Sequence, residues 1–139
     1  AQALVGNPDI LLLDEPTAGL DPEERLNFKN VVRKIKNDKC VILSTHIVTD
    51  IEALCDKILV LLNGKITQFD SYKELANIAK GKVFAVENTD DIACDFYSLG
   101  SVSINEKNYV KIICKNRIDA LELEPTVEDG YICFIENLN

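Results

Sequence analysis

Methionine is absent from all 139 residues of this chain, including the first. Because natural chains begin with methionine, the absence predicts a fragment or a processed product of a longer protein. The residues from Ala1 to Val5 agree with this, since they have the pattern of the last turn of a helix that Gly6 ends. We therefore expect the chain to be part of a larger protein.

Basic residues and long apolar runs are also scarce. Fifteen Lys and Arg residues stand against 23 Asp and Glu residues, which gives a net charge of −8. This sign argues against a general affinity for nucleic acid or anionic lipid. No apolar run approaches the roughly 20 residues that span a bilayer, and no signal peptide is recognisable. The hydrophobic content of 47% is that of a globular protein.

The cysteines lack the features of a disulfide framework or a metal site. They number five, and no two have the short spacing of a zinc knuckle. Each stands among apolar neighbours, which favours reduced core cysteines in a cytosolic protein. These residues are Cys40, Cys55, Cys94, Cys114 and Cys133.

The most informative stretch is ILLLDEPTAGLDP at residues 10–22. Four apolar residues, typical of a buried strand in a parallel sheet, lead directly into Asp14 and Glu15. Pro16 ends the strand. Asp21 then has the features of a helix N-cap, because Pro22 fits the first helical position and a glutamate follows at capping-box spacing.

A second apolar strand is predicted at residues 40–43, and it leads into Ser44, Thr45 and His46. A helix ending near residue 37 should precede it, and another should follow from Ile47 to Cys55. Strand, helix and strand with short connections predict a βαβ unit with parallel strands. The expected buried stripe of the first helix consists of Phe28, Val31, Val32 and Ile35.

The rest of the chain has a different pattern. Strands are predicted at 57–62 and 65–69, joined by a type I′ turn at Asn63 and Gly64, and Ser71 should cap a short helix. A boundary follows near residue 80. Residues 80–139 read as a small α+β module with a mostly antiparallel sheet and a final helix capped by Thr126. The predicted fold class is therefore α/β with parallel strands, followed by this module.

The expected chemistry lies at the ends of the first two strands, where α/β proteins bind ligands. Asp14 could hold a hydrated Mg²⁺ on the phosphates of a nucleotide, since hard cations prefer oxygen ligands. Glu15 could orient or deprotonate an attacking water, and His46 could hydrogen-bond the γ-phosphate or hold the water and base in line. Simpler interpretations also exist. Asp14 and Glu15 could be only a solvated strand end, His46 could be a purely structural histidine, and Asp21 could be a helix cap without a further role.

Several of these segments together resemble a known family. Residues 11–22 resemble the Walker B segment and D-loop of ABC-transporter ATPase subunits, and residues 44–46 resemble their H-loop. Residues 52–57 and the hairpin at 63–65 are similar as well. The resemblance covers roughly residues 1–79, while residues 124–129 resemble the end of the C-terminal extension in exporter ATPases of the ABC-2 type.

The resemblance implies that residues 1–79 are part of a P-loop ATPase core and residues 80–139 an accessory module. Asp14 would serve Mg²⁺, Glu15 would be the general base and His46 the switch histidine. Asp21 would lie where two ATPase subunits sandwich ATP. The partners implied are transmembrane permease subunits and a second ATPase subunit, with no nucleic acid, at the cytoplasmic face of the cell membrane.

The sequence also departs from this family's pattern. It has no G-x-x-x-x-G-K-[ST] phosphate loop, no glutamine-bearing loop can be placed, and the signature segment would precede Ala1. We therefore expect this polypeptide alone neither to bind nor to hydrolyse ATP with useful affinity. Two other functions stay open: a soluble ABC-class ATPase that does not transport, and a non-enzymatic regulatory or dimerisation module at 80–139.

Overall fold

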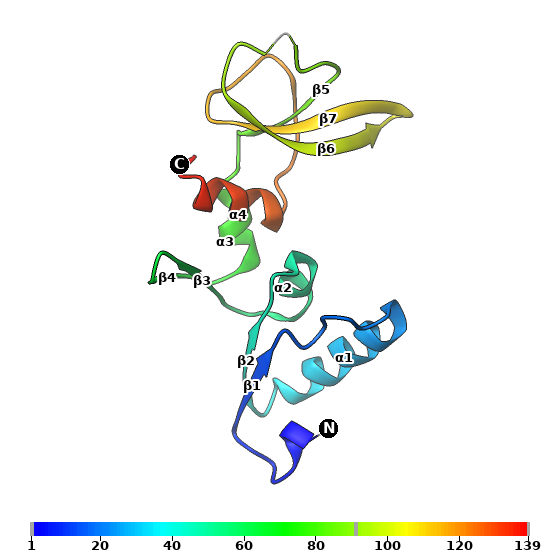
Figure 1. Cartoon of the computed structure of the whole chain (residues 1–139), viewed down its shortest axis with the longest axis vertical. Coiled ribbons are helices and arrows are strands. Elements are labelled where there is room, and N and C mark those ends of the chain that lie inside the picture. Colours follow the sequence, from blue (N-terminus) through cyan, green and yellow to red (C-terminus); the bar gives the residue numbers. More distant parts are fainter. Residues whose placement is uncertain (1, 91, 139) are drawn as a thin grey trace. The chain divides into compact units, whose positions relative to one another are not determined.

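The computed structural model describes residues 2–90 and 92–138, so Ala1, Asp91 and Asn139 lie outside the description. The chain forms two compact units, Ala1–Asp56 and Lys57–Asn139, whose elements are labelled in Figure 1. Both units mix helices and strands, which confirms the α/β class. Among the described residues, no helix combines the length and the apolar character that crossing a membrane would require.

The first unit contains the predicted βαβ segment. Its two strands pair in parallel, with Ile10 opposite Cys40 and Asp14 opposite Ser44. A short 3₁₀ helix lies where the end of a helix was predicted. In chain order, the elements are η1 (Gln2–Leu4), β1 (Ile10–Asp14), α1 (Pro22–Ile35), β2 (Cys40–Ser44) and α2 (Val48–Leu54).

Helix α1 begins as the sequence predicts. The Asp21 side chain accepts a hydrogen bond from the Glu24 amide at 2.8 Å, and the Glu24 side chain accepts one from the Asp21 amide at 3.4 Å. This reciprocal capping box satisfies amide groups that a helix start leaves unpaired. The last helical residue is Ile35, two residues before the predicted end.

The predicted burial of this unit is wrong in part. Only Val32 of the expected stripe on α1 is buried, whereas Val31 is 47% exposed. On β1, Leu11 is buried but Leu12 is 70% exposed. Periodicity identifies which residues share a face, but burial also needs a second layer against that face. Within the described residues of this unit, α2 packs against α1.

The second unit is built around an antiparallel sheet with strand order β6-β7-β5-β8. A separate hairpin, β3-β4, turns at Asn63 and Gly64 with φ of 50° and 75°, as the type I′ prediction requires. The elements are β3 (Ile58–Leu62), β4 (Lys65–Phe69), α3 (Tyr72–Asn77), β5 (Val83–Val86), β6 (Phe96–Ile104), β7 (Lys107–Cys114), β8 (Leu121–Glu122) and α4 (Val127–Ile135).

Residues 57–79 pack with the C-terminal segment of the second unit. The Phe69 ring meets the Phe134 ring edge-to-face, with centroids 5.4 Å apart, and α3 lies against α4. The compact units therefore divide after Asp56, whereas the composition changes near residue 80. The assignment of 1–79 to an ATPase core and 80–139 to an accessory module remains a prediction.

The cysteines occupy different environments. Cys114 and Cys133 are buried, Cys55 and Cys94 are half-buried, and Cys40 is exposed at the start of β2, so the core interpretation is wrong for Cys40. All five are free thiols. Burial, with a smaller contribution from the nearby Cys94, raises the pKa of the Cys114 thiol to about 12.

The contact between α3 and α4 yields a prediction at Gly130. A Cβ at this position would overlap the Leu75 carbonyl and lie 2.7 Å from the Cα of Ala76. Since backbone atoms cannot rotate away, we expect Gly130→Ala to force the helices apart and destabilise this unit by about 3 kcal/mol. Thermal unfolding followed by circular dichroism measures the loss.

Glu128→Ala on the exposed side of the same helix is the matched control. It should lower stability by less than about 1 kcal/mol, the usual effect of a carboxylate near a helix N-terminus. A Gly130→Ala variant as stable as the control would contradict the close approach.

Candidate functional site

The in-register pairing of β1 and β2 brings their polar C-terminal residues together. The Ser44 hydroxyl donates to the Asp14 carboxylate and accepts from the Glu15 amide at 3.1 Å. The Glu15 amide also lies 3.1 Å from the Ser44 carbonyl. Ser44 thus holds Asp14 at an exposed position and fixes the backbone where Glu15 leaves the strand.

Glu15 adopts an unusual backbone conformation, with φ of 44°. Left-handed φ is uncommon for residues other than glycine, and it persists where the surrounding structure enforces it, often at functional sites. The proline at position 16 restricts this residue further. The turn after β1 is therefore a strained segment that needs support from its neighbours.

His46 lies beside Glu15, with its Nδ1 atom 2.9 Å from the Glu15 Oε2 atom. Oε2 is buried, and His46 is its one polar contact among the described residues. The imidazole is 75% exposed. The structure therefore joins Glu15 and His46 next to Asp14, at the ends of the two paired strands.

Asp21, the fourth predicted site residue, lies in a different environment at the start of α1. Asp21 is engaged in the capping box of α1, so its role as a helix cap is observed. A cap does not exclude an interface role, which stays a prediction. Within the described residues, no group of three or more His, Cys, Asp or Glu side chains is placed to hold a metal ion.

A buried charge cluster next to the strand ends escaped the sequence analysis. Asp50 on α2 is 1% exposed. Its carboxylate lies 2.7 Å from Lys29 Nζ and 3.2 Å from Arg25 Nε, and the Thr17 hydroxyl donates to it at 2.5 Å. This cluster (Thr17, Arg25, Lys29 and Asp50) joins α1, α2 and the segment that follows Glu15.

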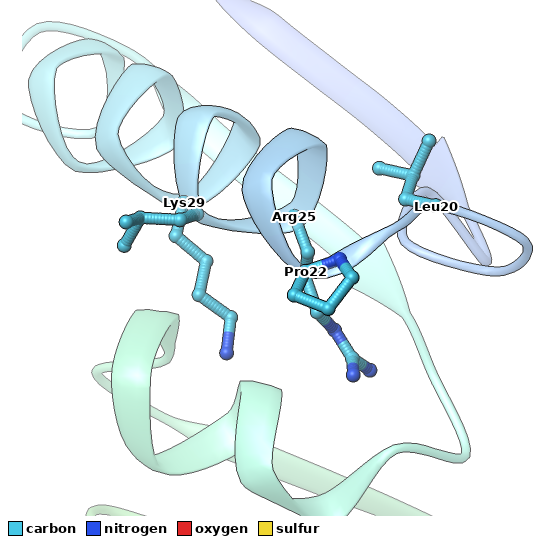
Figure 2. Close-up of a pocket in the computed structure, with 5 residues that line it drawn as sticks. Leu20, Pro22, Arg25 and Lys29 are labelled. Carbon is cyan, nitrogen blue, oxygen red and sulfur yellow. The ribbon is translucent and has the colours of Figure 1, made fainter.

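The two basic side chains of the cluster also line a pocket of about 400 Å³. Figure 2 shows Arg25 and Lys29 extending from one face of α1 toward α2. Their spacing of four residues places them on the same helix face. Because these two cations share the single carboxylate of Asp50, the cluster keeps a net charge of +1 beside the pocket. Its lining consists of Leu20, Pro22, Arg25, Leu26 and Lys29.

The cluster could hardly have been found from the sequence. Asp50 follows His46 by four residues in a helix of seven, where an aspartate normally faces solvent. Its burial depends on partners that are 33 and 25 residues away. The available signal was the four-residue spacing of Arg25 and Lys29.

The sequence of this chain is similar to those of several known proteins. The uncharacterized ABC transporter ATP-binding protein YxlF of Bacillus subtilis is 31% identical over 131 residues, covering 94% of this chain and 42% of YxlF. ABC transporter A family member 12 of Arabidopsis thaliana is 40% identical over 75 residues, covering 54% of this chain and 8% of that protein. The chain belongs to the ABC transporter ATP-binding proteins.

Other comparisons add less. The ABC-type organic anion transporter ABCA8B of Mus musculus is 31% identical over 119 residues, covering 80% of this chain and 7% of its own length. A solved metal-chelate type ABC transporter in an inward-facing conformation matches with a TM-score of 0.44 and 18% identity, over 76% of this chain and 40% of its own. No protein-family model matches. This ABC chain thus spans less than half of each of these proteins.

The Asp50 cluster predicts how the first unit responds to acid. Burial raises the pKa of Asp50, but hydrogen bonds from Lys29 and Thr17 and the charges of Lys29 and Arg25 outweigh it and lower the pKa overall. A lowered folded-state pKa stabilises the fold above the unfolded value of about 3.9. That contribution is lost as the pH falls through the folded-state pKa.

We therefore expect Asp50→Asn to destabilise the first unit by about 3 kcal/mol near pH 7, as for a broken buried ion pair. The difference from the wild type should shrink as the pH falls below about 4. Amide hydrogen exchange of α1 and α2 measures this for the unit alone. A difference that stays constant down to pH 2 would show that the charge of Asp50 is not involved.

Proposed function

We propose that this chain is part of the ATP-hydrolysing subunit of an ABC-type exporter. The observation that carries the proposal is the Glu15–His46 contact of 2.9 Å beside Asp14, at the ends of two parallel strands in register. Membership of the ABC ATP-binding proteins supports it. In this proposal, residues 1–79 belong to the ATPase core and residues 80–139 form an accessory module.

The residues at the strand ends fit Mg²⁺, the metal ion proposed to act together with ATP. Asp14 is exposed and offers hard carboxylate oxygens, and Mg²⁺ commonly takes only one or two protein carboxylates alongside water and phosphate oxygens. Bound Mg²⁺ would supply charge that neutralises the phosphates. Asp14 would hold the ion through water, and Ser44 keeps the Asp14 carboxylate in place by its hydrogen bond.

Glu15 is the proposed general base. Its side chain is 37% exposed, so the carboxylate can accept a proton from an attacking water that lies within hydrogen-bond reach, while its Oε2 atom contacts His46. His46 approaches the same oxygen through Nδ1, which leaves Nε2 for the γ-phosphate or the water. The reaction class is phosphoryl transfer to water, in which positioning and charge stabilisation provide most of the rate.

The proposed partners follow from the same assignment. A second ATPase subunit would face Asp21, and permease subunits would hold the assembly at the cytoplasmic face of the membrane. ATP binding and hydrolysis would then change the conformation of the permease. The chain itself lacks a phosphate-loop sequence, so we propose that it is inactive alone.

The decisive variant is Glu15→Gln in a protein that carries this chain together with a phosphate-binding loop. We expect the kcat for ATP hydrolysis to fall at least about 100-fold, the usual contribution of a general base, with little change in ATP affinity. Glu23→Gln on the exposed start of α1 is the control. Retention of wild-type kcat by Glu15→Gln would refute the assignment of the base.

The isolated chain provides a separate test. Isothermal titration with Mg²⁺ and ATP should detect no binding at micromolar concentrations, because no residues of the chain form a phosphate loop. Micromolar binding of ATP by the chain would contradict the proposed inactivity, whichever result Glu15→Gln gives.

A further inference from the structure

The ends of β1 and β2 are connected at two places. Ser44 provides the first connection through its hydrogen bonds to Asp14 and Glu15. The second lies farther along each chain segment, where the Thr17 hydroxyl donates to Asp50 at 2.5 Å. Thr17 comes two residues after Glu15, and Asp50 comes four residues after His46. The Glu15–His46 contact therefore lies within a closed ring of connections.

The second connection is firm because its acceptor is buried. Asp50 is 1% exposed and Thr17 is 3% exposed, so neither side chain can exchange its partner for water without opening the structure. A buried carboxylate is stable only with charged or hydrogen-bonding partners around it. Arg25 and Lys29 supply the charges from α1, which anchors the segment after β1 and helix α2 to the same helix.

The Glu15–His46 pair has little support of its own. The imidazole is 75% exposed, and Glu15 is its single polar contact within the part of the chain that is described. The position of the ring therefore depends on the backbone from Ser44 to Asp50. At one end this segment is held by β2, and at the other Asp50 holds it. Within it, the Thr45 hydroxyl accepts from the Ile47 amide at 3.0 Å.

Glu15 depends on the same anchor. Its φ of 44° is maintained by Ser44 on one side and by the residues that follow the turn on the other. Thr17 is the first buried side chain after Glu15, and its hydroxyl donates a hydrogen bond to Asp50. Release of this bond frees the turn to relax toward ordinary φ values, which would move the Glu15 carboxylate away from the imidazole.

We propose that Asp50, through Thr17, is a positioning residue that keeps Glu15 and His46 in contact. Its value for catalysis rests on the function proposed above, whereas the positioning itself is a property of this chain. The residues act through the backbone, because neither Asp50 nor Thr17 forms a hydrogen bond or ion pair with the imidazole. The shared carboxylate makes α1, the turn after β1 and helix α2 move as one body.

The experiment uses the single histidine of the chain. Its imidazole ¹H and ¹⁵N resonances report the contact with Glu15 without any nucleotide. The spectrum of Glu15→Gln defines the state in which the carboxylate charge is lost. We expect Thr17→Val, which keeps the side-chain shape but removes the hydroxyl, to shift the His46 resonances by the larger part of that difference. Thr17→Ser restores the hydroxyl and should return them to the wild-type values.

Asp56→Asn is the matched control. It breaks the ion pair between Lys36 and Asp56, whose atoms are 2.7 Å apart, and this pair also connects α1 with the end of α2. Because it does not touch the Asp50 carboxylate, the His46 resonances should stay at their wild-type values. Equal shifts in Asp56→Asn and Thr17→Val would overturn the proposal. Any weakening of the contacts between α1 and α2 would then be enough to move the His46 resonances.

A folded Thr17→Val variant with wild-type His46 resonances would also overturn it, as would a Thr17→Ser variant that shifts as far as Thr17→Val. If Thr17→Val does not fold, Lys29→Gln decides, because Lys29 is partly exposed and its loss weakens the cluster without removing the carboxylate. Shifted His46 resonances in this variant support the proposal, and unchanged resonances overturn it. Failure of the ATPase assignment leaves these spectra unaffected.

Discussion

The parallel pairing of β1 with β2 is the contact on which the candidate site depends. Backbone hydrogen bonds set Asp14 opposite Ser44, and the side chains of the two strand ends follow from that register. A shift of one residue would turn Asp14 away from Ser44 and separate Glu15 from His46. Since two strands alone are weakly stabilised, the cluster at Asp50 provides the additional support that keeps the strand ends together.

The site illustrates how a strained residue is maintained. Glu15 has a left-handed backbone before a proline, which the local sequence disfavours. The amide of Glu15 bonds to Ser44 on one side, and Thr17 bonds to the buried carboxylate on the other. The buried ion cluster need not raise overall stability. In the role proposed above, it restricts the turn to one conformation and so positions Glu15, the proposed general base.

The local elements were largely predictable because their causes act within a few residues. The apolar run before Asp14, the capping box of Asp21 and Glu24, and the Asn63-Gly64 turn all formed as expected. The burial of Val31 and Leu12 was not predictable, since it depends on which layer covers a face.

The sequence by itself therefore determined the family, the two strand ends and the residue types available for chemistry. These depend on short motifs whose spacing is visible in the chain. The tertiary structure alone decided that Glu15 meets His46, that Asp50 is buried, and that Gly130 permits α3 and α4 to touch. Each of these results from contacts between residues distant in sequence, where desolvation and close packing determine the outcome and local propensity has no influence.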